Sequence, residues 1–319
     1  MDLQSVADSL TIYRQPIECK GFFAAWGTVG VPGSRSGNLI AVLTVPIRQL
    51  GESERAAVER VLDRDPYAGA QIAERVAAHG LSWWRSDGRI WGYGGRRIES
   101  ICWSGAHLIP VCATSAAVAA YADLLGSETR MCSSIIGRAD AVLDLWARLG
   151  GHWGPARDVR PHQPLLVTDA DPPIAPDPEV RLVQPNEVDR LFPAAVAMYT
   201  EEVGVSPLLD DGGRGYRRRI NELVRGRRAY ARFDGDRVIF KAELAIVTAR
   251  TTQVQGVWVD PEYRGRGLAA AAMAAVTWDA LHRVAPTVSL YVNDYNAPAR
   301  RVYARCGFTS AGEFATVLF

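Results

Sequence analysis

The sequence has few of the features that mark disulfide-rich, metal-dependent or membrane-bound proteins. Its five cysteines are an odd number, and no two of them stand at CxxC or metal-ligand spacing. His107 and His282 each stand alone, without other metal-ligating residues around them. These absences predict no metal site, no disulfide framework and a reducing, cytoplasmic setting.

Long apolar runs are also missing. The most apolar stretch near the N-terminus, residues 17–31, is short, contains Glu18 and Lys20, and is broken by glycines. A membrane span needs about 20 apolar residues, and a signal segment needs an uninterrupted apolar core, so the sequence predicts neither. Gly, Ser and Pro are mixed without a steady period over residues 1–38, which we expect to form a poorly ordered tail.

Neither sign of charge is in excess. Lys and Arg number 36 against 35 Asp and Glu, a net charge of +1, which gives no general attraction to nucleic acid or to an anionic membrane. Residues 214–228 are the exception, with seven arginines and one glutamate and therefore a local charge of +6. Only Tyr216 lies among them, whereas nucleic-acid binding favours interleaved aromatics. A solvated helix balanced by nearby acids is the favoured interpretation, and attraction of an acidic substrate or of phosphates is the alternative.

What is present indicates a folded protein of about two domains. The chain has 319 residues, 48% of them hydrophobic and 22% charged, and roughly 150 residues make a typical domain. Residues 168–179 contain four prolines in twelve positions, a composition that excludes a helix and disfavours a strand. We therefore predict one domain at 39–168 and another at 180–319, joined by a proline-rich linker at 169–179.

Hydrophobic periodicity predicts a mixed α/β fold with a similar order of elements in both parts. In the first part, strands or helices are expected at 42–47, 52–62, 68–79, 89–103, 107–113, 115–126, 130–136, 139–151 and 164–168. In the second they are expected at 180–183, 186–203, 216–226, 229–233, 237–247, 251–259, 268–284, 287–292 and 297–307, followed by two final strands. Aligning the helices at 139–151 and 297–307 places Trp146 opposite Tyr303 and indicates a diverged internal duplication.

A glycine-rich loop follows the expected strand at 251–259 and precedes a long expected helix. Its residues are Arg264, Gly265, Arg266, Gly267, Leu268 and Ala269. Glycines let the backbone approach a ligand closely, and the N–H groups and dipole of a helix N-terminus attract anions. The segment therefore predicts a phosphate site, although a glycine turn alone would be only a connection.

A second segment lies about 30 residues further on. The expected strand ends at Asn293, Asn296 stands at a helix N-cap position, Tyr303 lies two turns into that helix, and Gly307 ends it. The two segments resemble the acetyl-CoA loop and the Asn-to-Tyr helix of the GNAT superfamily of N-acetyltransferases. The chain is also similar to a group of actinobacterial GNAT proteins with an extra N-terminal domain.

The resemblance implies a mixed α/β sheet with tandem GNAT-like folds, a degenerate N-terminal one and a complete C-terminal one. Where a phosphate loop would recur in the first part stands the segment 113–117, Ala-Thr-Ser-Ala-Ala, without glycine. The first part is therefore expected to be structural or substrate-shaping, and the second to be catalytic.

The resemblance also implies the residues that bind acetyl-CoA, the co-substrate. Its pyrophosphate would lie on the backbone N–H groups of Arg266, Gly267, Leu268 and Ala269, with Arg264 and Gly265 opening the loop. Its pantetheine arm would run along the strand at Val257 and Val259, whose backbone could also polarise the thioester carbonyl. Asn293 and Asn296 would hydrogen-bond the arm, and Asn296 would at least cap its helix.

Tyr303 is the implied general acid, because a phenol beside the thioester sulfur can protonate the departing thiolate. Its alternative role is that of a core tyrosine. Many relatives carry a carboxylate on the strand before the loop, but this chain has Gln253 and Gln255 there. Glu243 on the neighbouring strand is the substitute that we predict as general base, and an ion pair with Lys241 is its alternative.

Glu201, Glu202 and Gln255 are expected to line the acceptor cleft, where the two glutamates would favour a cationic amine. Two glutamates that are only solvated on a helix are the alternative. The sequence thus predicts an N-acetyltransferase that acts on a primary amine of a peptide or small molecule through a ternary complex, as a monomer or homodimer, without nucleic-acid or membrane partners. An acyl-CoA-binding regulatory or scaffolding protein is a second hypothesis. A purely structural tandem domain is a third.

Overall fold

The structure, a computed structural model, describes residues 47–82, 87–209 and 211–319. The expected tail at 1–38, and nearly all of the expected strand at 42–47, lie outside these residues. The helices are α2 (Arg55–Arg64), α3 (Ala70–His79), α5 (Ser115–Gly126), α6 (Ala139–Trp153), α7 (Val188–Val203), α8 (Arg214–Arg225), α9 (Leu268–Arg283) and α10 (Ala297–Arg305). The strands are β1 (Ile47–Gln49), β2 (Gly88–Tyr93), β3 (Ser100–Gly105), β4 (His107–Val111), β5 (Ser134–Arg138), β6 (Asp158–Thr168), β7 (Arg181–Leu182), β8 (Ala229–Asp234), β9 (Arg237–Val247), β10 (Thr252–Val259), β11 (Val288–Tyr291) and β12 (Thr309–Leu318).

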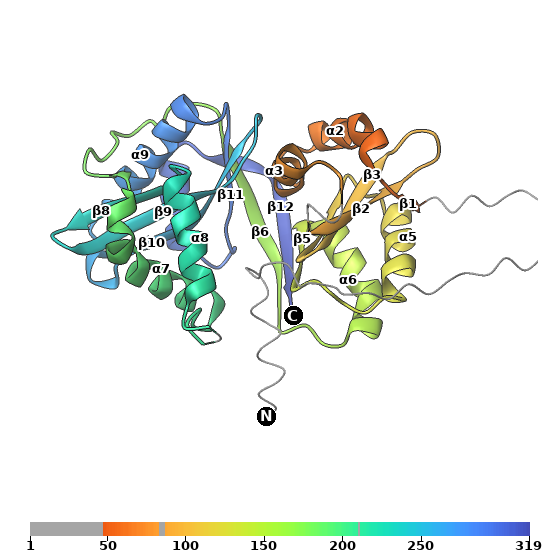
Figure 1. Cartoon of the computed structure of the whole chain (residues 1–319). Coiled ribbons are helices and arrows are strands. Elements are labelled where there is room, and N and C mark those ends of the chain that lie inside the picture. The colour runs from red at the N-terminus through yellow and green to blue at the C-terminus, as the bar shows by residue number, and fades with distance from the viewer. Residues whose placement is uncertain (1–46, 83–86, 210) are drawn as a thin grey trace, which may run out of the picture.

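Within the described ranges, all twelve strands join in one sheet. Their order is β1-β2-β3-β4-β5-β12-β6-β11-β10-β9-β8-β7. Figure 1 shows the two ends of this sheet on opposite sides of the molecule, with β6 and β12 between them. The mixed α/β fold expected from the periodicity is therefore confirmed.

The sheet consists of the same unit twice. In the N-terminal half (residues 47–168), β2, β3 and β4 are antiparallel, and β5 pairs with β4 in parallel after α5 crosses over. In the C-terminal half (residues 181–319), β8, β9 and β10 are antiparallel, and β11 pairs with β10 in parallel after α9. The helices α6 and α10 follow the two parallel strands at equivalent places, as expected from the internal duplication.

The two halves exchange their last strands. Strand β6 follows α6 in the chain but pairs with β11 of the C-terminal half, whereas β12 follows α10 and pairs with β5 of the N-terminal half. Strands β6 and β12 also pair with one another. The proline-rich segment 169–179 then connects β6 to β7 outside every helix and strand, and the domain boundaries drawn from it stay a prediction.

The expectation of two final strands is wrong. The chain ends in one strand, β12, with irregular pairing to β6 between Ser310 and Glu313. Gly312 lies at the irregularity with a φ of +118°. Its sequence context resembles a turn, but β12 pairs with β6 both before and after it, so the glycine makes an irregularity instead of a reversal.

Helices cover both faces of each half of the sheet (Figure 1). In the C-terminal half, α7 and α8 pack on one face around Tyr216 and Ile220, and α9 and α10 pack on the other around Met273 and Tyr303. The helix α7 ends at Gly204, which has a φ of +77° and donates its N–H to Thr200. No described helix is long and apolar enough to cross a membrane.

Candidate functional site

The glycine-rich loop joins β10 to the N-terminus of α9, as expected. Gly265 and Gly267 have φ values of +75° and +80°, in the left-handed region that favours glycine. A Cβ atom added at either glycine would meet no heavy atom within 4 Å, so the loop is open to solvent at both positions. The first helical residues are Leu268 and Ala269, and no side chain caps the helix at Gly267. The first N–H groups of α9 are thus available to an external acceptor.

The two arginines of the loop have different surroundings. Arg264 donates from Nε to the Val259 carbonyl at 2.9 Å and from a terminal nitrogen to the Glu201 carboxylate at 2.7 Å. Glu201 also accepts a hydrogen bond from the Trp258 indole at 3.2 Å. Arg266 is exposed, and its guanidinium lies over the Tyr263 ring, 5.2 Å from the centroid. The pair of Arg264 and Glu201 ties the start of the loop to the end of α7, and the hydrogen bond from Arg264 lowers the pKa of Glu201.

Strands β10 and β11 separate shortly after they begin. Their parallel pairing covers only Thr252 with Val288 and Gln253 with Ser289. Beyond these residues β10 continues beside β9, and β11 continues beside β6, on their outer edges. The edges of residues 254–259 and 290–291 that face one another are therefore not joined by strand pairing. The gap between these two strands leads toward the loop at 264–267.

A bulge interrupts β10 at the same place. Gln255 pairs with Glu243 and Trp258 pairs with Lys241, so two residues of β10 lie opposite one of β9. Gly256 lies in the bulge with a φ of +57°, and its carbonyl accepts a hydrogen bond from Lys241 Nζ at 3.0 Å. A Cβ atom at this position would come within 2.9 Å of the same nitrogen, so the site requires glycine.

Glu243, the predicted general base, forms an ion pair with Lys241. The carboxylate oxygen and Lys241 Nζ are 3.1 Å apart, and the two side chains are 10% and 1% exposed. The ion pair that the sequence offered as the alternative role of Glu243 is therefore present in the structure. Whether Glu243 also accepts a proton stays a proposal.

Tyr303, the predicted general acid, is 7% exposed and packs in the core of α9 and α10. Its ring meets Phe308 edge-on, with centroids 6.0 Å apart. Burial raises the pKa of its phenol, and the charge of Glu202 raises that pKa further. The hydroxyl therefore stays protonated at neutral pH, as a proton donor must.

Glu202 lies at the end of α7 with its side chain exposed to solvent. The surrounding protein still removes part of its hydration, and this desolvation raises the pKa of the carboxyl group. The charges of Arg160 and Lys241 oppose the rise, and that of Glu243 adds to it. The structure thus groups Glu202 with Glu243 and Tyr303 electrostatically, although the three are far apart in sequence.

The predicted polar residues near the gap have mixed surroundings. Gln255 donates to Gln253 at 3.0 Å, and the Asn296 side chain caps α10 by accepting from Ala299 N–H at 3.2 Å. Asn293 accepts from Gln163 at 2.8 Å and donates to Tyr295 at 2.8 Å.

Sequence reasoning did not find Gln163 or Arg160 as neighbours of this site. Both belong to β6, which comes from the N-terminal half. A possible signal was the unusual composition of this central strand, which begins with polar residues and contains Pro161 and Pro164.

The corresponding place in the N-terminal half holds no such site. Thr114 caps α5 by accepting from Ala117 N–H at 3.3 Å, and Ser115 donates to Asp144 at 2.8 Å. The strands β4 and β5 also pair at only two positions, but a Cβ atom at Gly137 of β5 would lie 3.3 Å from the Pro110 carbonyl of β4, so these strands stay close at that point. The degenerate character expected of this half is consistent with both observations.

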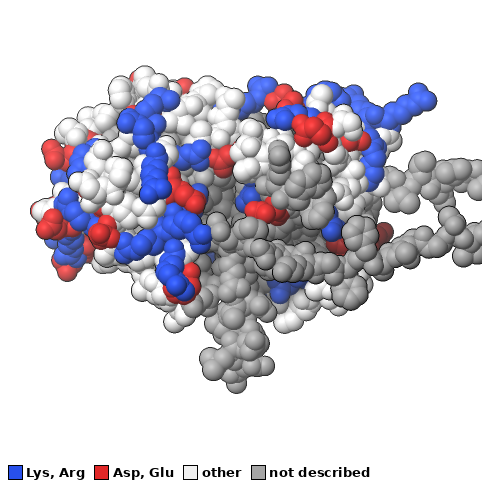
Figure 2. Space-filling view, viewed as in Figure 1, with Lys and Arg blue, Asp and Glu red and all other residues white. Residues whose placement is uncertain are grey.

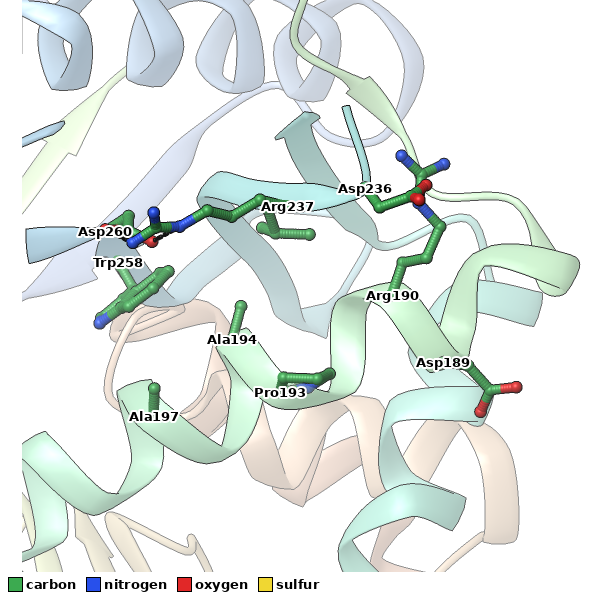
Figure 3. Close-up of a pocket in the computed structure, with 10 residues that line it drawn as sticks. Asp189, Arg190, Pro193, Ala194, Ala197, Asp236, Arg237, Trp258 and Asp260 are labelled. Carbon is green, nitrogen blue, oxygen red and sulfur yellow. Dashed lines mark hydrogen bonds and ion pairs between the residues drawn. The ribbon is translucent and has the colours of Figure 1, made fainter. Parts of the chain in front are cut away.

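A separate surface cavity of about 590 Å³ lies between one face of α7 and the beginning of β9 (Figure 3). Arg237 forms a two-pronged ion pair with Asp260 there, at 2.7 and 2.8 Å, and Trp258 forms part of the wall. The sequence did not predict this cavity. Its other charged groups are also paired, Arg190 with Asp236 and Asp189 with Arg217 of α8.

The arginine-rich segment forms α8 and the turn after it, as expected. Figure 2 shows a concentration of basic residues over this helix. Arg217 pairs with Asp189, and Arg228 pairs with Glu74 of α3 at 2.6 Å. The opposite face of α8 buries Tyr216 and Ile220 in the core. The interpretation as a solvated helix partly balanced by acids fits these contacts.

Within the part of the chain that the structure describes, no group of three or more His, Cys, Asp or Glu side chains could hold a metal ion. His107 instead shares a hydrogen bond with Ser134 at 2.8 Å, and burial lowers its pKa to about 4.

Two protein-family models match different parts of the chain. Residues 194–308 match the acetyltransferase (GNAT) family, and residues 88–191 match a domain of unknown function, DUF4081. A search of curated proteins gave no significant match.

Solved structures with similar folds cover most of the chain. A GNAT-family acetyltransferase from Colwellia psychrerythraea aligns with 86% of this chain and 99% of its own, at 11% identity and a TM-score of 0.50. A Drosophila protein aligns with 86% and 98%, at 13% identity and a TM-score of 0.59. A tandem GNAT protein from the clavulanic acid biosynthesis pathway aligns with 85% and 97%, at 15% identity and a TM-score of 0.47. At these identities the first two comparisons show a shared fold.

Proposed function

Since residues 194–308 are a GNAT-family domain, we propose that this protein is an acetyl-CoA-dependent N-acetyltransferase that acts on a primary amine of a peptide or small molecule. One observation carries the proposal. The strands β10 and β11 part after two pairs of residues, and the gap leads to an uncapped helix N-terminus behind Gly265 and Gly267. A long molecule with a phosphate group at one end fits this arrangement.

The residues present fit acetyl-CoA at both ends of the gap. The N–H groups of Arg266, Gly267, Leu268 and Ala269 would hold the pyrophosphate, and added Cβ atoms at the glycines would meet nothing. Arg266, which is exposed, would add positive charge, and Arg264, paired with Glu201, would hold the start of the loop. At the other end, Asn293 and the backbone at Val257 and Val259 would hold the arm.

The direction of the backbone groups supports this placement. Asp260 N–H bonds to the Ile239 carbonyl of β9 at 3.0 Å. Successive N–H groups of a strand alternate between its two edges, so that of Val259 points toward the gap. Lys241 holds the Gly256 carbonyl, which fixes the bulge next to Val257. Fixed backbone donors of this kind can stabilise a developing negative charge on a carbonyl oxygen.

When bound, acetyl-CoA would supply an acetyl thioester. In our proposal, Glu201, Glu202 and Gln255 line the acceptor side and attract a cationic amine. Nearby carboxylates take the proton that the amine loses. Glu243 is the residue that the sequence predicts for this role. The Tyr303 phenol, protonated at neutral pH, gives a proton to the departing thiolate.

The test combines calorimetry with acetyl-CoA and CoA release in the presence of amines and N-terminal peptides. We expect micromolar binding and amine-dependent CoA release. In Tyr303→Phe, kcat should fall about 100-fold, because a positioned acid typically contributes this much, while the Kd for acetyl-CoA stays the same. Tyr93→Phe is the matched control, since Tyr93 is half-buried on β2 in the N-terminal half of the sheet, remote from β10 and β11 in the strand order. Equal turnover in Tyr303→Phe and the wild type would contradict the role of Tyr303.

An acyl-CoA-binding regulatory or scaffolding protein is the second candidate. The ion pair of Glu243 with Lys241 favours it, as does the pair of glutamines at positions 253 and 255. It predicts acetyl-CoA binding without CoA release for any amine. Action in the cytoplasm and a monomeric or homodimeric state belong to both candidates as proposals.

A further inference from the structure

Glu202 lies near the end of α7, and charged and titratable groups of several other elements act on it. Its own helix, α7, ends one residue later, at Val203. Its carboxylate interacts electrostatically with charged or titratable side chains of four other elements: Arg160 of β6, Lys241 and Glu243 of β9, Tyr291 of β11 and Tyr303 of α10. The last of these is the proposed general acid.

Glu202 differs from the two other glutamates of the site in its contacts. Glu243 is paired with the buried Lys241 at 3.1 Å, and Glu201 is paired with Arg264 at 2.7 Å. The Glu202 carboxylate makes no hydrogen bond or ion pair with any residue that the structure describes, although the residue lies at the surface at the end of α7. Its raised pKa makes it more basic than its neighbour Glu201, whose pKa is lowered.

The exchanged strand β6 positions this residue without neutralising it. The Arg160 guanidinium donates to the Glu202 backbone carbonyl at 3.1 Å and to the Asp158 carboxylate at 2.8 Å. Arg157 donates to the Val203 carbonyl at 3.2 Å. Two arginines from the N-terminal half thus cap the C-terminal end of α7, where unpaired carbonyls favour positive charge.

We propose that Glu202 is the residue that accepts the proton of the acceptor amine, and that Arg160 of the exchanged strand holds it in position. The inference rests on the proposed acetyltransferase function and deepens it. It gives the N-terminal half a role in the C-terminal site, and it leaves Glu243 to hold Lys241 under the bulge of β10.

The protons balance in the following way. The ammonium form of the acceptor gives one proton to the Glu202 carboxylate, which later releases it to water. The amine nitrogen then forms a bond to the carbonyl carbon as the carbon–sulfur bond breaks. The thiolate takes a proton from Tyr303, and the second proton lost by the nitrogen restores that phenol. The net reaction releases one proton for each ammonium group acetylated.

The test compares the pH dependence of kcat/KM in the full-length wild type, Glu202→Gln and Glu202→Asp. We expect Glu202→Gln to lower kcat/KM at least 100-fold and to abolish the acidic limb, which reports the ionisation of the base. Glu202→Asp should recover part of the rate and keep the limb. Glu222→Gln, a change of an exposed glutamate on α8, is the control and should match the wild type.

The results distinguish a failure of the role of Glu202 from a failure of the proposed acetyltransferase function. If Glu202→Gln keeps the acidic limb and at least half of the activity, Glu202 is not the base, although the proposed function stands. If the wild type binds acetyl-CoA and transfers to no amine, the proposed function fails, and this proposal fails with it. Arg160→Gln should lower kcat with little change in the Kd for acetyl-CoA; wild-type kinetics in this variant would overturn the positioning role.

A measurement without turnover tests the same point. In protein labelled with ¹³C at the glutamate carboxyl carbons, one resonance should titrate above the ordinary glutamate pKa of about 4.3 and disappear in Glu202→Gln. A Glu202 resonance that titrates at or below the ordinary value would overturn the proposal.

Discussion

Lys241 is the residue that illustrates how this site is built. Its ammonium group is buried on β9, where it meets the Glu243 carboxylate and the carbonyl of Gly256. A buried charge is tolerated only when it is paired and hydrogen-bonded, and here both conditions are met. The same contacts fix the bulge in β10 at the gap. The pairing of the buried charge and the shape of the proposed site therefore depend on the same two contacts of Lys241.

Replacing Lys241 should therefore be costly. In Lys241→Met, the Glu243 carboxylate remains buried without its partner, and the free energy of unfolding should fall by about 3 kcal/mol. The double variant Lys241→Met, Glu243→Gln removes both charges and should recover most of this loss. Urea unfolding monitored by circular dichroism measures both. A single variant as stable as the wild type would show that the pair is solvated.

At the scale of elements, the connection between β10 and α9 determines where a phosphate could bind. The loop needs two glycines in the left-handed region, Gly265 and Gly267, and the helix behind it has no side-chain cap. The N-terminal half has the same strand, connection and helix, but Thr114 caps α5 with its own hydroxyl. The same supersecondary unit is thus open at one end of the molecule and closed at the other.

Two matched glycine-to-alanine substitutions distinguish the effect of backbone strain on stability from an effect on acetyl-CoA binding. Gly267 and Gly235 both have positive φ, and a Cβ atom at either would meet nothing within 4 Å. Gly267→Ala and Gly235→Ala should each lower the free energy of unfolding by about 1 kcal/mol, because alanine disfavours this conformation.

Only Gly267→Ala should weaken acetyl-CoA binding, by at least tenfold in calorimetry, since Gly235 lies in the turn between β8 and β9. Equal affinities in the two variants would mean that the loop at 264–267 does not contact the phosphates.

At the scale of the whole molecule, the exchange of β6 and β12 joins the two halves. The C-terminal residue, Phe319, is buried in the core of the N-terminal half, with its ring centroid 5.4 Å from that of Trp146 and 6.0 Å from that of Trp153. The Arg130 guanidinium lies 4.3 Å from the same ring centroid. Phe319 thus completes a core that also contains Cys102 of β3, which lies far earlier in the sequence.

This arrangement predicts that the halves unfold together. Phe319→Ala should lower the free energy of unfolding by about 3 kcal/mol, as expected for a buried aromatic, and should shift one cooperative transition without splitting it. Leu209→Ala, at a residue that is 65% exposed, is the control and should change stability by less than about 0.5 kcal/mol. Two separate calorimetric transitions in the wild type would contradict the coupling of the halves.

Local sequence patterns determined the elements and the glycine-rich loop. The positions of α5, α7, α9 and α10 follow from helical periodicity, caps and glycines, all of which act over a few residues. Gly265 and Gly267 are recognisable for the same reason, since a left-handed loop between a strand and a helix depends on adjacent residues. Tyr303 could be placed two turns from its cap at Asn296 on these grounds alone.

Only the tertiary structure decided which strands become neighbours and which charges meet. The exchange of β6 and β12 depends on contacts between residues about 150 positions apart, such as Thr316 with Gln163, and no local pattern encodes them. It brings Arg160 to the end of α7 beside Glu202, and the pairing of β9 with β10 brings Lys241 to the Gly256 carbonyl. A side chain's chemistry depends on the charges and solvent around it, so the different surroundings of Glu201, Glu202 and Glu243 became visible only in the folded chain.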